Sequence, residues 1–435
     1  MKENIRSLQK IFVASNASDT ILKYIHIKSM GWNPFSAVTN LGFGFISNYT
    51  HAAGEQDFTS EELTKAYGYL MNNVFRATRA VNMKTAVKIS QLMMEYGVVG
   101  DIREGTNSHA IKGIKEKFKV LLPYEMTSRA EFINQGSTFI AMMLNTKNIK
   151  DLNNKDRTLF EAYTLDADNN LIWNEAEFGP QEAWQSLGKS KTAFKLKLEA
   201  VKKIIHGNYD PNSPVAIKKT ALGRAAMMFR NWVAEGFANR FESEYENIKL
   251  GRKVKGRYTS FYTAKTKEGD PVGIGRSISL TLQEMARILT RGLYNSKGVN
   301  ALTDVDKANL KKNAMELNIY LSIMVLGMML KHMNDGDDDD ESALFLTFMI
   351  NNFNRLQTDI TFYTSPLSFE KLQRNSIPAF GFITDVARLN KAAYKYIIGE
   401  DGKNGSTTFQ ESFFRVFPLG FAYYRTESIV EDVQE

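Results

Sequence analysis

Cysteine is missing from all 435 positions of this chain. Without thiols the sequence offers no disulfide, no thiolate nucleophile and no Cys-ligated zinc or iron–sulfur site. Histidine occurs five times, and no two histidines stand three or four residues apart, so a His–His metal pair on one helix face is excluded. We therefore predict no metal ion, no cofactor and no catalytic residue.

Proline and long apolar runs are also scarce. The nine prolines fall between periodic segments, where their missing N–H group does not break a helix. The most apolar run, 317–330, has 14 uncharged residues, whereas a helix needs about 20 to cross a membrane. We interpret this run as a helix buried in protein. A membrane-inserting hairpin over 317–353 stays open as the alternative.

Helical periodicity dominates what is present. Thr59 and Glu62 have the spacing of a capping box, and apolar residues then recur on one face, as in a packed amphipathic helix. The sequence predicts a mainly α protein: an elongated multi-helix assembly with two small β-hairpin insertions and a C-terminal helical hairpin. The expected helices cover approximately 4–30, 34–52, 59–70, 83–97, 108–121, 124–144, 180–206, 214–250, 278–295, 304–333, 342–363 and 380–398.

Two short segments predict strands. Residues 163–165 and 171–173 flank an Asp- and Asn-rich turn, which is typical of a hairpin. Residues 257–263 alternate and are rich in β-branched and aromatic side chains, and 267–270 is expected to turn that strand towards Val272.

Composition along the chain suggests three domains. We expect an N-terminal helical domain over 1–155 and a basic middle region with long helices and small hairpins over 156–276. A C-terminal helical domain over 277–435 is expected to contain the apolar hairpin 317–353. No strict repeat of 20–50 residues occurs, so a solenoid is not supported.

Positive charge gathers in the middle of the chain. The formal net charge is +7, and residues 185–257 hold sixteen Lys and Arg against six Asp and Glu. Such a segment is a candidate contact zone for DNA phosphates or for an acidic partner protein, and solvated helix faces are the alternative. The residues that we single out are Lys189, Lys191, Lys195, Lys197, Lys218, Lys219, Arg252, Lys253, Lys255 and Arg257.

Two further motifs are weak signals for ligands. The glycine-rich stretch 273–277 lacks the lysine and spacing of a phosphate loop, and we read it as a turn into a helix that begins near Ser279, with phosphate binding as the alternative. An acidic run between two apolar helical segments predicts the tip of a helical hairpin, and it departs from a calcium loop at two positions. Weak divalent-ion binding there stays open. The run consists of Asp337, Asp338, Asp339, Asp340 and Glu341.

Several blocks together resemble one family. In order along the chain they are NPFSAVTNLG at 33–42, EFINQ at 131–135, AMML at 141–144, LFEAY at 159–163, GRAAMMFRNW at 223–232 and NFNRLQTDITFY at 352–363. The chain resembles a segment of the very large virion-associated polyproteins of crAss-like and related tailed bacteriophages. Each block is loose, and their order and number carry the resemblance.

The resemblance implies an internal virion protein of cargo or ejection type. Such a protein lies in the phage head or tail, is delivered to the host cell with the genome, and is a homo-oligomer or present in several copies. Its implied partners are other virion proteins (portal, tail or other cargo chains), genomic DNA and, during ejection, a membrane. The packaged RNA polymerase modules of the family need an Asp-rich metal motif among strands, and this activity is not carried over because 337–340 is expected between helices.

Our leading hypothesis is thus a non-enzymatic structural or cargo protein. Long helices without disulfides suit a chain that passes a tail channel partly unfolded and refolds quickly. Three alternatives remain: an enzyme acting on the host envelope or nucleic acid, a DNA-binding internal protein, and a membrane-active component of an ejection channel.

Overall fold

The structure of the chain is a computed structural model. It describes residues 24, 34–77, 83–98, 125–147, 149–186, 190–207, 231–291, 302–334, 378–399 and 408–416. The helices in these ranges are α3 (Pro34–Ala52), α4 (Ser60–Ala77), α5 (Met83–Glu95), α8 (Glu125–Asn145), α9 (Glu175–Phe178), α10 (Gln181–Ser186), α11 (Lys191–His206), α13 (Asn231–Phe241), the 3-10 helix η2 (Thr259–Phe261), α14 (Ile274–Arg291), α15 (Asp304–Asn334), α18 (Pro378–Ile397) and α19 (Phe409–Val416).

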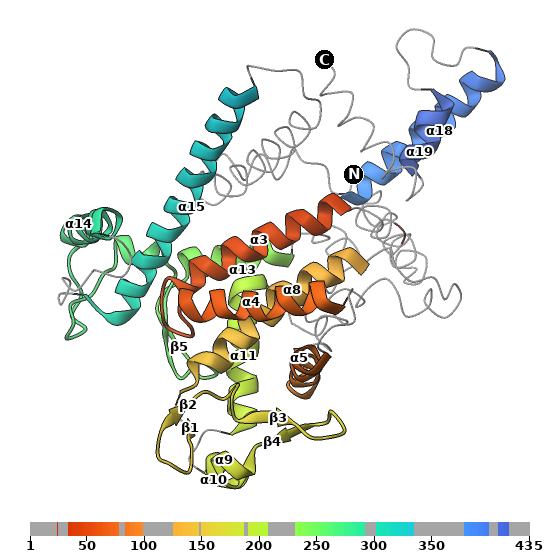
Figure 1. Ribbon diagram of the computed structural model, residues 1–435. Helices are drawn as coiled ribbons and strands as arrows, with labels where there is room; N and C mark the ends of the chain where they lie inside the picture. The colour runs from red at the N-terminus through yellow and green to blue at the C-terminus, as the bar shows by residue number, and fades with distance from the viewer. Residues whose placement is uncertain are drawn as a thin grey trace, which may run out of the picture.

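Within the described ranges, the strands form small antiparallel pairs. They are β1 (Ile149–Lys150) with β2 (Asp156–Arg157), β3 (Tyr163–Leu165) with β4 (Leu171–Trp173), and β5 (Tyr245–Asn247) with β6 (Arg252–Val254). The predicted mainly α fold is confirmed, with three small sheets in place of the two expected hairpins. Figure 1 shows these pairs at the margins of the helical body.

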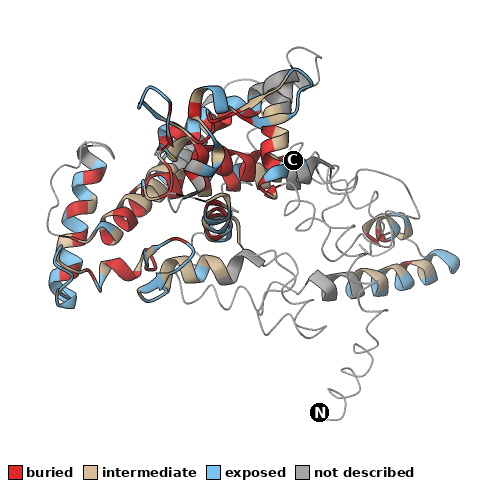
Figure 2. Cartoon of the chain, turned by 90° about the horizontal axis from the view of Figure 1, so that it is seen from below, coloured by how far each residue is buried: buried red, intermediate tan, exposed pale blue. Residues whose placement is uncertain are grey.

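The core begins where α3, α4 and α8 pack together (Figures 1 and 2). The predicted capping box starts α4: the Thr59 N–H donates to Glu62 Oε2 at 2.9 Å, and the Glu62 N–H donates to Thr59 Oγ1 at 3.3 Å. Both bonds satisfy N–H groups that lack partners inside the helix. The apolar face that follows is fully buried. It supplies Leu63, Ala66 and Leu70 to the core, where they lie with Phe139, Ile140 and Met143 of α8.

The predicted hairpin at 163–173 is confirmed. Tyr163 pairs with Trp173 and Leu165 with Leu171, and the Asp166 side chain accepts the N–H groups of Asp168 and Asn170 within the turn. These side-chain bonds are the local reason for a turn at this point. Tyr163 and Trp173 point inward and extend the core towards α10 and α11.

The helix expected over 180–206 is interrupted. It forms as α10 and α11, and Ser190 caps the second helix by accepting the Ala193 N–H at 3.1 Å. A serine at this position favours a new helix start over a continuous helix.

The helix expected over 214–250 is wrong at its C-terminal end, because α13 ends at Phe241 and the β5–β6 hairpin follows. Its turn includes Gly251 at φ 63°, a backbone conformation that glycine adopts without strain. Residues 208–230 lie outside the described residues.

The strand expected over 257–263 is also wrong. Thr259–Phe261 of this segment form η2, and just before it the Arg257 and Tyr258 N–H groups donate to the Asn239 and Arg240 carbonyls of α13. Its β-branched and aromatic composition is overridden by these tertiary hydrogen bonds. The turn at 267–270 does form, with the Thr266 N–H donating to the Asp270 carbonyl at 2.9 Å.

A second, smaller core lies between η2, α14 and α15. It contains Ala264, Ile288, Leu302, Leu310 and Ala314. α14 begins at Ile274, so the expected helix start near Ser279 is wrong, and the glycine-rich stretch lies in the first turn of the helix.

The two cores can be compared with the expected division of the chain into three domains. The larger core draws on residues from both sides of position 155, and the smaller one on residues from both sides of position 276. The three-domain division stays a prediction.

At the C-terminal end, α18 and α19 pack on each other, and the Tyr24 hydroxyl donates to the Val416 carbonyl at 2.9 Å. The expected helices at 108–121 and 342–363, most of 4–30, the second arm of the apolar hairpin and the acidic tip at 337–341 lie outside the described residues. Among the described helices, none has the length and apolar character that a membrane crossing requires.

Candidate functional site

Asp57 is the centre of a buried ionic cluster. It lies in the loop between α3 and α4 with a fully buried side chain. Its Oδ2 atom accepts from His51 Nε2 at 3.0 Å and from an Arg252 guanidinium nitrogen at 2.6 Å, and its Oδ1 atom lies 3.4 Å from Lys197 Nζ. The cluster, which we call the Asp57 cluster, thereby joins α3, α11 and β6.

The electrostatics of this cluster favour a charged carboxylate beside a neutral imidazole. Burial alone would raise the pKa of Asp57, but the hydrogen bond from His51 and the positive charges of Arg252 and Lys197 hold it well below its usual range. Burial, followed by the charge of Lys312, lowers the pKa of His51 to about 4. His51 is therefore neutral at pH 7 and donates its Nε2–H to Asp57.

The pKa values of Lys312 and His206 are lowered as well. Burial, followed by the charge of Arg252, lowers the pKa of Lys312 to about 7, and this lysine donates to Gln56 Oε1 at 3.0 Å. Burial, followed by the charge of Lys202, lowers the pKa of His206 to about 3. Burial thus opposes positive charge throughout this region.

Glu316 of α15 is the centre of a second cluster, the Glu316 cluster. Its Oε1 atom accepts from Arg240 at 2.8 Å and from Arg257 at 2.6 Å, while the Tyr258 hydroxyl donates to its Oε2 atom at 3.2 Å. Burial would raise the pKa of Glu316, and the two arginines hold it below its usual range. Two guanidinium groups on one carboxylate fix the end of α13 against α15.

A third ion pair is almost fully buried. Lys255 Nζ lies 2.8 Å from Asp306 Oδ1 and also donates to the Thr263 carbonyl at 2.6 Å, with the two charged side chains 2% and 0% exposed. Asp306 belongs to α15. On this helix, the Asn309 amide donates to the Lys255 carbonyl at 3.1 Å and the Asn313 amide donates to the Arg257 carbonyl at 3.1 Å.

These α15 residues form one stripe. Asp306, Asn309, Asn313 and Glu316 recur at helical spacing, so they lie on one face of α15. Along that face they bind the charges and carbonyls of the segment 255–260. The polar stripe fixes this segment and gives the Lys255 and Arg257 carbonyls hydrogen-bond partners.

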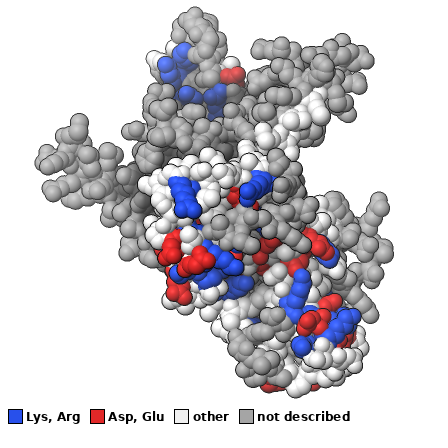
Figure 3. Space-filling view, turned by 90° about the vertical axis from the view of Figure 1, so that its left-hand side faces the viewer, with Lys and Arg blue, Asp and Glu red and all other residues white. Residues whose placement is uncertain are grey.

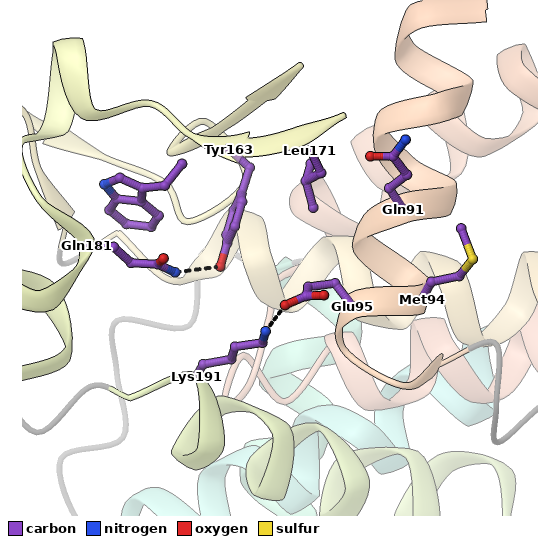
Figure 4. Close-up of a pocket in the computed structure, with 8 residues that line it drawn as sticks. Gln91, Met94, Glu95, Tyr163, Leu171, Gln181 and Lys191 are labelled. Atoms are coloured by element: carbon purple, nitrogen blue, oxygen red, sulfur yellow. Dashed lines mark hydrogen bonds and ion pairs between the residues drawn. The ribbon is translucent and has the colours of Figure 1, made fainter. Parts of the chain in front are cut away.

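A surface groove lies between α5, the β3–β4 hairpin, α10 and α11 (Figure 4). Its volume is about 530 Å³, within the range of small-molecule sites. Gln181 donates to the Tyr163 hydroxyl at 3.2 Å, and Figure 4 shows Lys191 pointing towards Glu95, with which it forms an ion pair. Gln91, another polar lining residue, donates to the Asn169 carbonyl at 2.7 Å.

The ionisable groups that line this groove have partners in the fold. The Glu95 carboxylate and the Lys191 ammonium neutralise each other, and the Tyr163 hydroxyl also bonds the Tyr96 hydroxyl at 2.9 Å. Burial raises the pKa of Tyr163, which keeps the phenol neutral at pH 7. Lys191 differs from Tyr163, because burial, followed by the charge of Lys195, lowers the pKa of Lys191.

Seven of the basic residues singled out from the sequence lie in the described ranges, and these have partners in the fold. On α11, Lys191 pairs with Glu95, Lys195 Nζ lies 5.9 Å from the centre of the Tyr96 ring, and Lys197 belongs to the Asp57 cluster. α11 therefore uses these cations inside the fold.

The basic residues near β6 also pair with carboxylates. Arg252, Lys255 and Arg257 belong to the clusters described above, and Lys253 lies 3.7 Å from Glu244 with a side chain 65% exposed. Figure 3 shows basic and acidic side chains intermixed on one face of the molecule. Lys189, Lys218 and Lys219 lie outside the described residues, and the contact-zone hypothesis stays a prediction.

Within the ranges that the structure describes, no group of three or more His, Asp or Glu side chains is placed to hold a metal ion. No family model, no curated protein and no solved structure matches this chain. The case for its function therefore depends on the residues themselves and on the resemblance noted above.

Sequence reasoning missed the acidic halves of the clusters. Asp57 stands in a loop and Glu316 in a long helix, and neither belongs to a motif. One signal was available: Asp306, Asn309, Asn313 and Glu316 form a polar stripe in a helix whose other positions include Leu310 and Ala314. A polar stripe beside an apolar one can mark a second buried face as well as a solvated one.

Proposed function

We propose that this chain is a non-enzymatic structural or cargo protein, packaged inside the virion of a tailed bacteriophage and delivered to the host cell with the genome. Two lines of reasoning support the proposal. The first is the resemblance to virion-associated polyproteins of crAss-like phages. The second is the use that the fold makes of its ionisable side chains.

The observation that carries the proposal is the pairing of buried carboxylates with distant cations. Asp57 binds Arg252, 195 positions away, and Glu316 binds Arg240 and Arg257 from another element. Buried pairs of this kind fix the arrangement of elements, and breaking them leaves an uncompensated charge. An enzyme would need acidic groups for catalysis. In this fold, Asp57 and Glu316 instead join separate elements through ion pairs.

The same pairing bears on the partners of the chain. For Lys255 or Arg257 to contact a DNA phosphate, these side chains, 2% and 10% exposed, would have to leave their carboxylates. This cost favours other virion proteins (portal, tail or cargo chains) over genomic DNA as the main partners. Membrane contact during ejection remains a part of the proposal that concerns the apolar segment 317–353.

Quantitative mass spectrometry of gradient-purified phage particles tests the packaging directly. We expect peptides of this chain at a fixed copy number per particle, in the several-copy range of internal proteins. A chain that is abundant in infected cells and missing from mature particles would contradict the proposal.

Enzyme assays test the non-enzymatic part separately. Purified protein should show no cleavage of cell-wall polymers or nucleic acids above a buffer control. Activity that disappears on replacing Glu95, the carboxylate that lines the groove, would overturn this part and leave the packaging result standing.

A further inference from the structure

Lys255 and Asp306 form an ion pair that is closed off from solvent. Their side chains are 2% and 0% exposed, and Lys255 Nζ lies 2.8 Å from Asp306 Oδ1. By contrast, Lys253 and Lys265, which both pair with Glu244, keep 65% and 31% of their side chains exposed. An amine and a carboxyl group are therefore held in contact inside the fold, where solvent does not reach them.

The two oxygen atoms of the Asp306 carboxylate have different partners. Oδ1 accepts from Lys255 Nζ, whereas Oδ2 accepts from the Thr303 hydroxyl at 2.7 Å and from the Lys265 N–H at 3.1 Å. Two donors aimed at one oxygen stabilise the negative charge that this oxygen gains when a nucleophile adds to the carboxyl carbon. The amine thus contacts one side of the carboxyl group, and the other side is held as an oxyanion would be.

We propose that Lys255 and Asp306 condense within the folded chain to an intramolecular amide bond, with the loss of one water molecule. The atoms of the pair suffice for the step. The Lys255 ammonium passes one proton to Asp306 Oδ1, and the nitrogen lone pair then adds to the carboxyl carbon, which places the negative charge on Oδ2. A second proton moves from the nitrogen to Oδ1. Oδ1 leaves as water, and the C=O double bond to Oδ2 forms again.

The surroundings of the pair suit the amide as well as the two charges. Its oxygen is Oδ2, which keeps the hydrogen bonds from the Thr303 hydroxyl and the Lys265 backbone. Its N–H keeps an acceptor in the Thr263 carbonyl, to which Lys255 Nζ donates at 2.6 Å. Burial of two charges is costly, and the amide carries none. Reacting groups held in contact also behave as if present at very high concentration, so burial and proximity both favour condensation.

The bond closes a loop of the chain. It joins positions 51 residues apart and links the first turn of α15 to the segment that follows β6. Unlike the neighbouring ion pairs, it persists when the fold opens. The bond does not depend on packaging in a virion, and in a packaged chain it keeps residues 255–306 as a closed loop while other segments extend.

Mass spectrometry of the intact, denatured full chain tests the proposal. The wild-type chain should be lighter than its sequence by the mass of one water molecule. Trypsin should then release a branched peptide in which residues 254–257 are joined to residues 298–307. A wild-type chain at its full sequence mass, or a water loss that leaves these two peptides separate, would overturn the proposal.

Lys255→Arg is the variant that isolates the reaction. Arginine keeps the positive charge beside Asp306, so the fold retains its ion pair, but its guanidinium stays protonated and does not condense with a carboxylate. This variant should have its full sequence mass. Lys253→Arg changes an exposed lysine two residues away and should keep the water loss. A water loss that persists in Lys255→Arg would show that the bond does not involve this amine.

The rate of bond formation in freshly synthesised, pulse-labelled protein tests the part played by the Thr303 hydroxyl. Thr303→Val removes one of the two donors to Oδ2 and should slow bond formation about a hundredfold, as the loss of one such donor usually does. Thr303→Ser keeps a hydroxyl and should restore the rate. Equal rates in the two variants would contradict the build-up of negative charge on Oδ2, and with it the proposed step.

Discussion

Gly256 lies where the chain passes the C-terminal end of α13 with no room for a side chain. A Cβ atom added there would come within 2.6–2.7 Å of backbone atoms of Arg240, Phe241 and Glu242. Backbone cannot move aside as a flexible side chain does, so we expect Gly256→Ala to lower the free energy of unfolding by about 2–3 kcal/mol, measured by urea denaturation.

Gly68 is the matched control for this prediction. It lies within α4 with open space around its Cβ direction. Gly68→Ala should raise the free energy of unfolding by about 0.5–1 kcal/mol, because alanine favours the helix. Destabilisation of similar size in both variants would contradict the steric explanation.

Two histidines with lowered pKa values predict a loss of stability in acid. His51 and His206 have folded pKa values of about 4 and about 3, below the ordinary value of 6.5. The unfolded chain takes up protons on these residues below pH 6.5 while the folded chain does not, so stability falls as the pH falls. Between pH 7 and pH 5 the expected loss is about 2 kcal/mol for each histidine.

The histidine prediction is checked by urea denaturation across this pH range. His51→Gln and His206→Gln should each flatten the pH dependence, even where they lower stability at pH 7. A wild-type chain that is as stable at pH 5 as at pH 7 would show that these imidazoles are not held neutral.

At the scale of elements, the Asp57 cluster joins α3, α11 and β6. Removal of the shared carboxylate leaves Arg252 and Lys197 without a counter-charge. We therefore expect Asp57→Ala to cost about 3–5 kcal/mol of unfolding free energy, the range for breaking one half of a buried pair. The measurement is denaturant unfolding at pH 7.

The exposed pair on α4 provides the comparison. Glu61 and Lys65 form an ion pair with side chains 76% and 59% exposed. Glu61→Ala should lower the free energy of unfolding far less than Asp57→Ala, because exposed ion pairs contribute little to stability. If Asp57→Ala costs no more than this, the cluster does not tie the elements together.

The polar stripe of α15 makes a different prediction. Asn309 donates to the Lys255 carbonyl and to Ser260 Oγ, at 3.1 and 2.9 Å. Asn309→Ala leaves both acceptors buried without a partner, at a cost of about 1–3 kcal/mol. Hydrogen exchange should become faster in residues 255–263 and stay unchanged in α8. Uniform acceleration would indicate global destabilisation instead.

Elements whose interactions are local in sequence could mostly be predicted, and those held by interactions between distant residues could not. The capping box at Thr59 and the turn at Asp166 depend on bonds within four residues, and both were predicted correctly. Residues 257–263 were predicted wrongly, because their conformation depends on hydrogen bonds to α13 and α15. Residues 242–250 were also predicted wrongly, although they form a local hairpin with 252–254. The Asp57 cluster could not be predicted, since its members are far apart in sequence and no local pattern marks them.

At the scale of the whole molecule, the helices depend on contacts that are local in sequence, whereas the ionic clusters join residues that are far apart in sequence. Helices form quickly, and proteins rich in local contacts fold in about microseconds to milliseconds. A chain delivered through a tail channel must break the ion pairs between distant residues and keep or re-form its helices. In an optical trap we expect rapid helix refolding at low force, and a rigid core that refolds only slowly would contradict delivery in a partly unfolded state.

Protease protection in purified particles tests the central claim most directly, namely that this chain is a structural component inside a virion. Intact particles treated with protease should retain the full chain, and particles opened by heat before treatment should lose it. Loss of the chain from intact particles would place it outside the virion, and its absence before any treatment would contradict the account altogether.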